Sequence, residues 1–239
     1  MPIQTRFHDY TDGSIALRAC LAWDDTITQP RPGVLVSHAW RGRSEFEDQK
    51  AHELAALGYL GFALDMYGVG KLGTSPEQNR SMMQPLIDDR EVLQRRISSA
   101  LTELRGLPEV DSARTAAIGY CFGGLCVLDL ARSGADINGV VSMHGLLGAP
   151  MNSATHDISA KVLIQHGWDD PMATPQDVLF ITQELSARKA DWQLHAFGNT
   201  LHAFTNPVAA DPANGLLFDA DADRRSWRGL QDFLQEVLD

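Results

Sequence analysis

The chain has 239 residues, of which 44% are hydrophobic and 21% are charged. This is the composition of an ordinary soluble globular protein, and it excludes a disordered chain, a fibrous repeat and a coiled coil. Twenty basic and 31 acidic residues give a formal net charge of −11. Such a surface repels phosphate backbones and anionic lipids, so we expect neither nucleic acid nor a membrane as a partner. The length predicts one domain, residues 1–239, whose core needs no disulfides.

The three cysteines are Cys20, Cys121 and Cys126. They form no C-x-x-C pair and show no spacing with histidine that is typical of a zinc site. The N-terminus, Met1-Pro-Ile-Gln-Thr-Arg-Phe-His8, has no apolar stretch of the kind found in signal peptides. Reduced thiols and the absence of a signal peptide predict a cytoplasmic protein. The absence of a zinc-site spacing predicts that the protein binds no metal.

The first part of the chain predicts a hairpin and then alternating strands and helices. Ile15 to Trp23 shows the alternation of a half-buried strand, and Phe7 to Tyr10 is its predicted partner across a turn at residues 11–14. The next predicted elements are a strand at 34–36, a helix at 47–57, a strand at 59–64, and a long helix whose apolar face runs from Leu86 to Leu104.

The second part continues the alternation. The predicted strands are 115–119, 139–143, 162–165 and 192–197, and the predicted helices are 122–132, 175–189 and 224–238. Apolar strands separated by amphipathic helices predict an α/β fold with a mostly parallel sheet, helices on both faces and the N-terminal hairpin as an antiparallel edge. Ligands bind such sheets beyond the carboxyl ends of the strands, so reactive side chains are expected there.

Cys121 lies at one of these strand-to-helix junctions, in Gly119-Tyr-Cys-Phe-Gly123. A nucleophile at such a turn needs small residues two positions before and after it, because the backbone is crowded. The pattern is that of a nucleophile elbow with cysteine in place of serine. The following helix N-terminus favours a thiolate.

A cysteine nucleophile needs a base and a group that orients the base. His202 follows the last predicted strand and is the expected base. His38 and His166 also follow strands and are expected to be structural residues or to line the wall of the site. His144 ranks between these two histidines and the expected base. Asp169 and Asp170 follow the penultimate strand, and either of them fits the order nucleophile, acid, base along the chain.

The oxyanion formed during acyl transfer needs two backbone donors. The N–H of Phe122, directly after the nucleophile, is the first expected donor. The second is expected from the loop after the strand at 34–36, from Ala39 or Trp40, and the preferred mechanism uses Ala39.

Five motifs in this order resemble the dienelactone hydrolases, a cysteine branch of the α/β-hydrolases. The motifs are His38–Gly42, Gly58–Gly68, Gly119–Gly124, Gly167–Pro171 and His202–Phe204. The resemblance implies an α/β-hydrolase fold with little or no lid, hydrolysis of an unsaturated lactone that carries a carboxylate, and no metal or cofactor. It also implies that the acid is Asp170.

One position departs from the family pattern. Family members often have glutamate after the histidine of the first motif, where it engages the resting nucleophile, and this chain has Ala39. We therefore expect Cys121 and His202 to rest as a thiolate–imidazolium pair, unless Glu45 or Glu47 replaces the missing carboxylate.

The resemblance also implies arginines that bind a substrate carboxylate. Arg80 and Arg41 are the candidates. Trp40 and Trp168 adjoin the motifs and are candidates for the wall of an apolar substrate pocket.

The preferred hypothesis is a hydrolase of small esters or lactones that acts through a Cys121–His202–Asp170 triad and a thioester acyl-enzyme. Its expected partner is the small-molecule substrate, and its expected state is a monomer or small homo-oligomer. Two alternatives stay open. One is a cysteine amide hydrolase such as a glutamine amidotransferase, although those typically carry His-x-Glu and this chain has His202-Ala-Phe204. The other is a non-catalytic small-molecule binder on the same scaffold.

Overall fold

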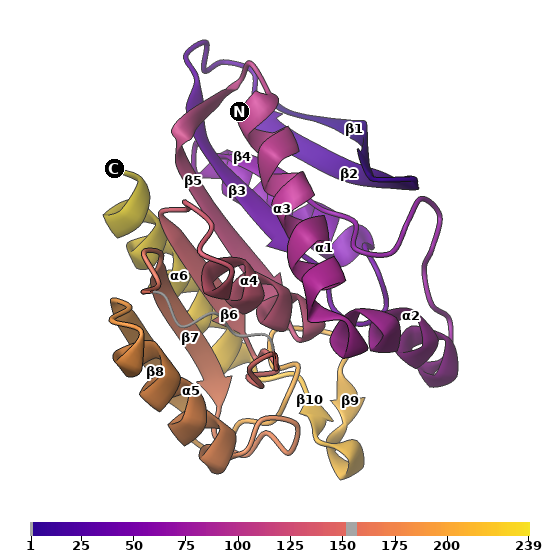
Figure 1. Cartoon of the computed structure of the whole chain (residues 1–239), viewed down its shortest axis with the longest axis vertical. Coiled ribbons are helices and arrows are strands. Elements are labelled where there is room, and N and C mark those ends of the chain that lie inside the picture. The colour runs from indigo at the N-terminus through magenta and orange to yellow at the C-terminus, as the bar shows by residue number, and fades with distance from the viewer. Residues whose placement is uncertain (1, 152–156) are drawn as a thin grey trace.

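A computed structural model describes residues 2–151 and 157–239 and is built around an eight-stranded sheet (Figure 1). The strand order is β1-β2-β4-β3-β5-β6-β7-β8. The strands of this sheet are β1 Ile3–Asp12, β2 Ile15–Asp24, β3 Arg31–Ser37, β4 Leu60–Ala63, β5 Val110–Tyr120, β6 Gly139–Met143, β7 Lys161–Gly167 and β8 Trp192–Phe197. The helices are α1 Glu45–Ala56, α2 Pro76–Asp88, α3 Arg90–Gly106, α4 Phe122–Arg132, α5 Pro175–Ala187 and α6 Ala220–Leu238.

The sheet is mostly parallel, with an antiparallel hairpin at its N-terminal edge. Strands β1 and β2 pair antiparallel along their whole length, and β2 pairs antiparallel with β4. From β4 through β3 and β5 to β8, every neighbouring pair is parallel. This arrangement confirms the predicted fold class and places the central strand β5 directly before Cys121.

Helices cover both faces of the sheet, and each face has its own apolar core. On one face, α1 and α6 bury Leu54, Leu230 and Phe233 against the strands. On the other face, buried leucines and isoleucines of α3, α4 and α5 pack together (Figure 1). Within the described ranges, no helix is both long enough and apolar enough to cross a bilayer.

The long helix predicted around Leu86–Leu104 is two helices. Asp89 leaves the helical conformation with φ −120° and ψ 86°, and its side chain accepts the N–H of Val92 at the start of α3. Leu86 therefore belongs to α2 and the later apolar residues to α3. The sequence did not predict α2 as a separate helix, because its first turns are polar and have no apolar stripe.

A small hairpin between β8 and α6 was also not predicted. It comprises β9 Ala210–Asp211, a 3-10 helix Pro212–Asn214 and β10 Leu216–Leu217. Strands of two residues are too short for an alternation pattern. The hairpin lies beside the candidate base, because Leu216 forms a parallel bridge with His202. Helix α6 begins at Ala220, four residues earlier than predicted, with Asp219 as its N-cap.

Candidate active site

Cys121 is the single residue between β5 and α4, and its backbone is strained. It has φ 55° and ψ −114°, a conformation that L-residues rarely adopt. Its N–H donates to the carbonyl oxygen of Met143 on the neighbouring strand β6 at 3.0 Å. The side chain is half-buried at the N-terminus of α4. The turn therefore holds the thiol where the first free N–H groups of a helix favour negative charge.

The glycines on either side of Cys121 make this turn possible. A Cβ atom on Gly119 would lie 2.0 Å from the carbonyl oxygen of Gly123, and a Cβ atom on Gly123 would lie 2.2 Å from the carbonyl oxygen of Ser37. Both contacts are with backbone atoms, which cannot move aside cheaply. This crowding is the physical reason for the small residues that the sequence pattern identified.

The other two cysteines are buried and have a different environment. Burial raises the pKa of the Cys20 thiol to about 11 and raises the pKa of the Cys126 thiol well above its usual range. Both thiols are therefore protonated at neutral pH. Cys126 lies on α4, five residues after Cys121, and is fully enclosed in the core.

His202 and Asp170 are in direct contact. The Nδ1 atom of His202 lies 2.6 Å from Oδ2 of Asp170, and the two side chains are 1% and 0% exposed. The second oxygen of Asp170, Oδ1, accepts the N–H of Met172 at 2.7 Å. A carboxylate can accept hydrogen bonds but cannot donate them. Asp170 therefore fixes a proton of His202 on Nδ1 and leaves Nε2 free to take up another proton.

Asp169 occupies a different environment although it adjoins Asp170. Its side chain is exposed, and its backbone N–H donates to the carbonyl oxygen of Thr200 at 3.0 Å. The structure therefore brings Asp170, and not Asp169, to His202.

The charge of His202 depends on Cys121. Burial by itself lowers the pKa of His202, but the charge of Cys121 and the hydrogen bond to Asp170 outweigh burial and raise this pKa to about 10. Its Nε2 atom is buried and has no hydrogen-bond partner within the described ranges. The free nitrogen and the influence of the thiol place Cys121 and His202 as neighbours.

The loop after β3 contains both expected second donors, and their amides differ. The N–H of Ala39 donates to Oε1 of Glu47 at 3.4 Å, so it is already occupied. The peptide that carries the N–H of Trp40 is held through its carbonyl group, because the oxygen of Ala39 accepts the N–H of Gly42 at 3.1 Å. Of the two residues, Trp40 is therefore the better candidate for an oxyanion donor, and the choice of Ala39 has a competing hydrogen bond against it.

Glu47 is a buried carboxylate beneath this loop, and it is 2% exposed. Its Oε2 accepts both the N–H and the hydroxyl of Ser44 at 2.8 Å, which caps α1. From the sequence, Glu47 was identified only as an alternative to the missing glutamate at position 39. Its contact with Ala39 depends on the tertiary structure and has no signal in the sequence.

Three further histidines surround the site, and burial lowers the pKa of each. His38 accepts the N–H of Met66 on Nε2 at 3.0 Å, which confirms a structural place for it in the loop framework. The ring of His144 lies edge-on to that of His202, with 5.1 Å between the centroids, and its Nε2 lies 2.8 Å from the hydroxyl oxygen of Thr205. Neither ring nitrogen of His166 has a hydrogen-bond partner within the described part of the chain.

The predicted substrate-binding residues differ in exposure and in their contacts. Trp40 is half-buried against the core, and Trp168 is 43% exposed with its ring against His166. Arg80 is exposed on α2, where it lines a surface pocket of about 450 Å³ together with Glu77 and Gln84. None of the three catalytic candidates lines that pocket.

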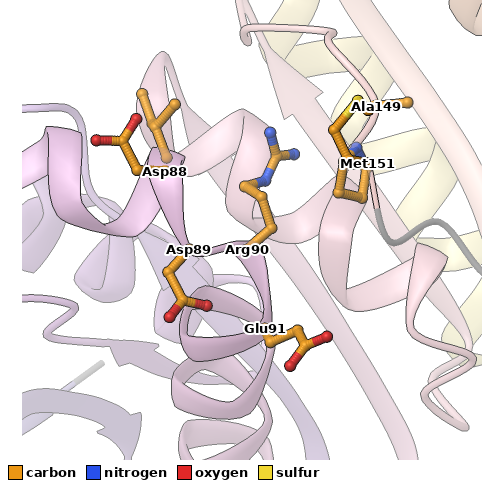
Figure 2. Close-up of a pocket in the computed structure, with 8 residues that line it drawn as sticks. Asp88, Asp89, Arg90, Glu91, Ala149 and Met151 are labelled. Carbon is orange, nitrogen blue, oxygen red and sulfur yellow. The ribbon is translucent and has the colours of Figure 1, made fainter.

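A second pocket, of about 290 Å³, lies at the junction of α2 and α3. Figure 2 shows Arg90 between Asp88 and the loop that carries Ala149 and Met151. Arg90 is not free to bind an anion there, because it forms a double hydrogen bond with the buried Asp129 at 2.5 and 2.6 Å. This pocket also lacks Cys121, Asp170 and His202.

Comparisons with known proteins identify the family of the chain. The family model described as "Dienelactone hydrolase family" matches residues 17–238. A solved structure described as a dienelactone hydrolase-like promiscuous phosphotriesterase from metagenomic libraries is 36% identical, with 99% of each chain covered and a TM-score of 0.95. An uncharacterised protein of Caenorhabditis elegans is 35% identical over 152 residues, which are 61% of this chain and 94% of that protein.

More distant structures share the fold. A dienelactone hydrolase from Anabaena variabilis is 17% identical, with 99% of each chain covered and a TM-score of 0.73. The family model spans nearly the whole chain and includes the strand-to-helix turn at Cys121 and the loops of Asp170 and His202. The chain therefore belongs to the dienelactone hydrolase family.

Proposed function

We propose that this protein hydrolyses small carboxylic esters or lactones through a thioester on Cys121. The observation that carries the proposal is the buried contact between Asp170 and His202, whose free Nε2 adjoins a cysteine on a strained turn. A nucleophile, a base and a group that orients the base are the parts that acyl transfer needs. Membership of the dienelactone hydrolase family supports the same chemistry.

The proposed reaction has two stages. The sulfur of Cys121 attacks the substrate carbonyl carbon, and the Nε2–H of the His202 imidazolium donates its proton to the leaving oxygen as the C–O bond breaks. Water then attacks the thioester while the neutral His202 accepts its proton, and the C–S bond breaks to release the acid. Asp170 keeps the imidazole ring in place and stabilises its charged form throughout.

The oxyanion formed in both stages needs donors that are already in position. We assign the N–H of Phe122, because it is the first residue of α4 and has no carbonyl to bond within the helix. We assign the second donor to the N–H of Trp40 in preference to that of Ala39, which donates to Glu47. The ring of Trp40 and that of Trp168 are proposed to contact the substrate, and Arg80 remains the proposed contact for a substrate carboxylate.

Two cysteine variants test the nucleophile. We expect Cys121→Ala to abolish the hydrolysis of p-nitrophenyl acetate without loss of fold, because the change removes one sulfur atom at a half-buried site. Cys126→Ala is the matched control, since it removes a sulfur from the same helix in the core. It should keep the chemistry with some loss of stability. An inactive Cys126→Ala beside an active Cys121→Ala would contradict the assignment.

Two aspartate variants test the acid. We expect Asp170→Asn to reduce kcat strongly, because an amide can present N–H groups to His202 and favour the wrong tautomer. The loss in kcat should be roughly a hundred- to ten-thousand-fold, which is the typical contribution of general acid–base catalysis. The adjacent Asp169→Asn should be mild, since Asp169 is exposed. Equal losses in both variants would mean that neither carboxylate is specifically the acid.

A second candidate activity is the hydrolysis of phosphotriesters. It is favoured by the 36% identity, over 99% of both chains, with the structure described as a promiscuous phosphotriesterase. The same thiolate would attack phosphorus and expel an aryl oxide. Release of p-nitrophenol from a dialkyl p-nitrophenyl phosphate, compared between the wild type and Cys121→Ala, tests this activity. A rate that does not depend on Cys121 would contradict it.

A further inference from the structure

Gly215 joins the two loops that carry Asp170 and His202. It is buried, follows the 3-10 helix Pro212–Asn214, and has the left-handed φ of 78°. Its carbonyl oxygen accepts the backbone N–H of His202 at 2.9 Å. Two residues later, the N–H of Leu217 donates to the carbonyl oxygen of His202 at 3.1 Å. Gly215 and the adjacent strand β10 therefore hold both polar backbone groups of His202.

The other side of Gly215 packs against the acid loop. A Cβ atom on Gly215 would lie 2.2 Å from Cγ and 2.6 Å from Cδ of Pro171. Pro171 directly follows Asp170, and the proline ring is closed on its own backbone, so it cannot rotate away as a flexible side chain does. Any side chain at position 215 must therefore push the backbone of the Asp170 loop, the backbone of the His202 loop, or both.

We propose that Gly215 is a positioning residue that sets the separation between Asp170 and His202. The inference rests on the proposed function, in which these two side chains form the acid–base pair. The absent side chain allows the closest approach of the two loops, and the 2.6 Å contact between Nδ1 and Oδ2 depends on that approach. Gly215 has no side chain to offer the substrate and acts only through these two residues.

The deciding variant is Gly215→Ala, and the chain offers a matched control. Gly70→Ala places the same methyl group at a φ of 77°, where nothing lies within 4 Å. Gly13→Ala is a second control, in the β1–β2 hairpin, with a φ of 58° and no atom within 4 Å. All three variants carry the strain of alanine in the left-handed region, but only Gly215→Ala meets the proline ring.

We expect Gly215→Ala to lower kcat for p-nitrophenyl acetate by about tenfold or more relative to Gly70→Ala, with KM little changed, because small misplacements of catalytic groups cost up to about a hundredfold. The double variant Gly215→Ala/Pro171→Ala lacks the Cγ and Cδ atoms that clash. Its kcat should recover to that of the Pro171→Ala single variant. A merely structural role for Gly215 would not produce this recovery together with an unchanged KM.

A readout without substrate separates this inference from the proposed function. The downfield proton NMR resonance of His202 Nδ1–H, assigned by its loss in His202→Asn, should move upfield in Gly215→Ala and return in the double variant. If the wild type fails to hydrolyse esters, the proposed function is wrong, and the resonance still decides the role of Gly215. The inference is overturned if Gly215→Ala matches Gly70→Ala in kcat and resonance.

The double variant also decides the case in which Gly215→Ala does not fold. Recovery of both the fold and kcat by Pro171→Ala in that background supports the inference. Recovery of the fold without recovery of kcat, or no recovery of the fold, overturns it.

Discussion

At the scale of single residues, the environment of Cys121 distinguishes it from the other two thiols. It lies on a strained turn at the start of a helix and beside a histidine whose pKa is raised to about 10. Cys20 and Cys126 are buried in apolar surroundings that raise the pKa of each thiol. The surroundings of Cys121 therefore favour the thiolate, whereas those of Cys20 and Cys126 favour the protonated thiol.

This contrast predicts the alkylation of Cys121. Because the pKa of His202 is raised, its positive charge is present throughout the neutral range and is lost only as the pH rises through about 10. We therefore expect iodoacetamide to modify Cys121 rapidly at pH 6, with little further increase to pH 8. Removal of the cation in His202→Asn should slow the reaction at pH 6 by about tenfold or more, since an ordinary thiol has a pKa of about 8.5.

Mass spectrometry of the modified peptides gives the rates, and the buried Cys20 and Cys126 serve as internal controls that should react slowly. A rate for Cys121 that rises only through pH 8 to 9, and that is the same in His202→Asn, would contradict the thiolate–imidazolium pair.

Local backbone geometry determines the type and spacing of some residues in the candidate site. These residues were predicted from the sequence. The glycines around Cys121 are required by the turn itself, and they were visible as a pattern. The choice of Asp170 over Asp169 came from a resemblance, and burial explains it physically. The occupied amide of Ala39 and the packing of Gly215 against Pro171 were not visible, because each depends on residues brought together only by folding.

At the scale of elements, helix α1 connects a cap to the candidate oxyanion loop. Glu47 closes a capping box with Ser44 through one carboxylate oxygen and accepts the N–H of Ala39 with the other. Helix α5 has the same kind of box, in which Asp177 accepts the N–H and hydroxyl of Thr174 at 2.8 and 2.7 Å. Helices α1 and α5 thus have the same kind of N-terminal cap. Of these two caps, the one on α1 also binds the loop after β3.

Replacing the capping carboxylate by an amide should therefore affect stability in both helices but activity only in α1. Glu47→Gln replaces one acceptor oxygen by an NH₂ group, so either Ala39 or Ser44 loses its acceptor. We expect the free energy of unfolding to fall by about 1–3 kcal/mol, the cost of a buried donor without a partner. We also expect kcat for p-nitrophenyl acetate to fall about tenfold or more, because the loop that carries the proposed Trp40 donor loses its support.

Asp177→Asn is the control, and it should cost about 0.5–2 kcal/mol of stability with kcat unchanged. Urea unfolding and steady-state kinetics measure both effects. A Glu47→Gln variant that is destabilised but fully active would mean that Glu47 only caps the helix.

The elements that the sequence failed to predict are the ones with few apolar residues or few residues of any kind. Helix α2 was merged into α3 because only its last turn contributes to the apolar face, and the break depends on the cap at Asp89. Strands β9 and β10 have two residues each, which is too few for any period. Strands β3, β4 and β6 were predicted because all of their residues are buried.

At the scale of the whole molecule, buried histidines couple stability to pH. Burial lowers the pKa of His38, His144 and His166, and each is 2% exposed or less. In the unfolded chain, histidine takes up a proton near pH 6.5. Below that pH, the unfolded state binds protons that the folded state excludes, so the free energy of unfolding falls as the pH decreases.

His202 changes the free energy of unfolding with pH in the opposite direction. Its pKa is raised to about 10, so its contribution to stability is complete below pH 6.5 and is lost as the pH rises from 6.5 to about 10. The three buried histidines therefore contribute to the loss of stability at acid pH, and His202 contributes to the loss at basic pH together with Cys20 and Cys126, whose thiol pKa values are also raised.

The loss of stability at acid pH gives a measurable prediction. Because burial lowers the pKa of all three histidines in the folded state, the free energy of unfolding should fall as the pH decreases below about 6.5, by at most about 1.4 kcal/mol per pH unit for each histidine that stays neutral. Urea unfolding at a series of pH values measures this change directly. In His144→Phe, which keeps an aromatic ring against His202 and Phe204, the slope below pH 6.5 should fall by about 1.4 kcal/mol per pH unit, the contribution of one proton. The slope is the informative quantity, since loss of the Thr205 contact lowers stability at every pH. If the slope in His144→Phe equals that of the wild type, His144 is protonated in the folded protein and does not contribute to the loss of stability at acid pH.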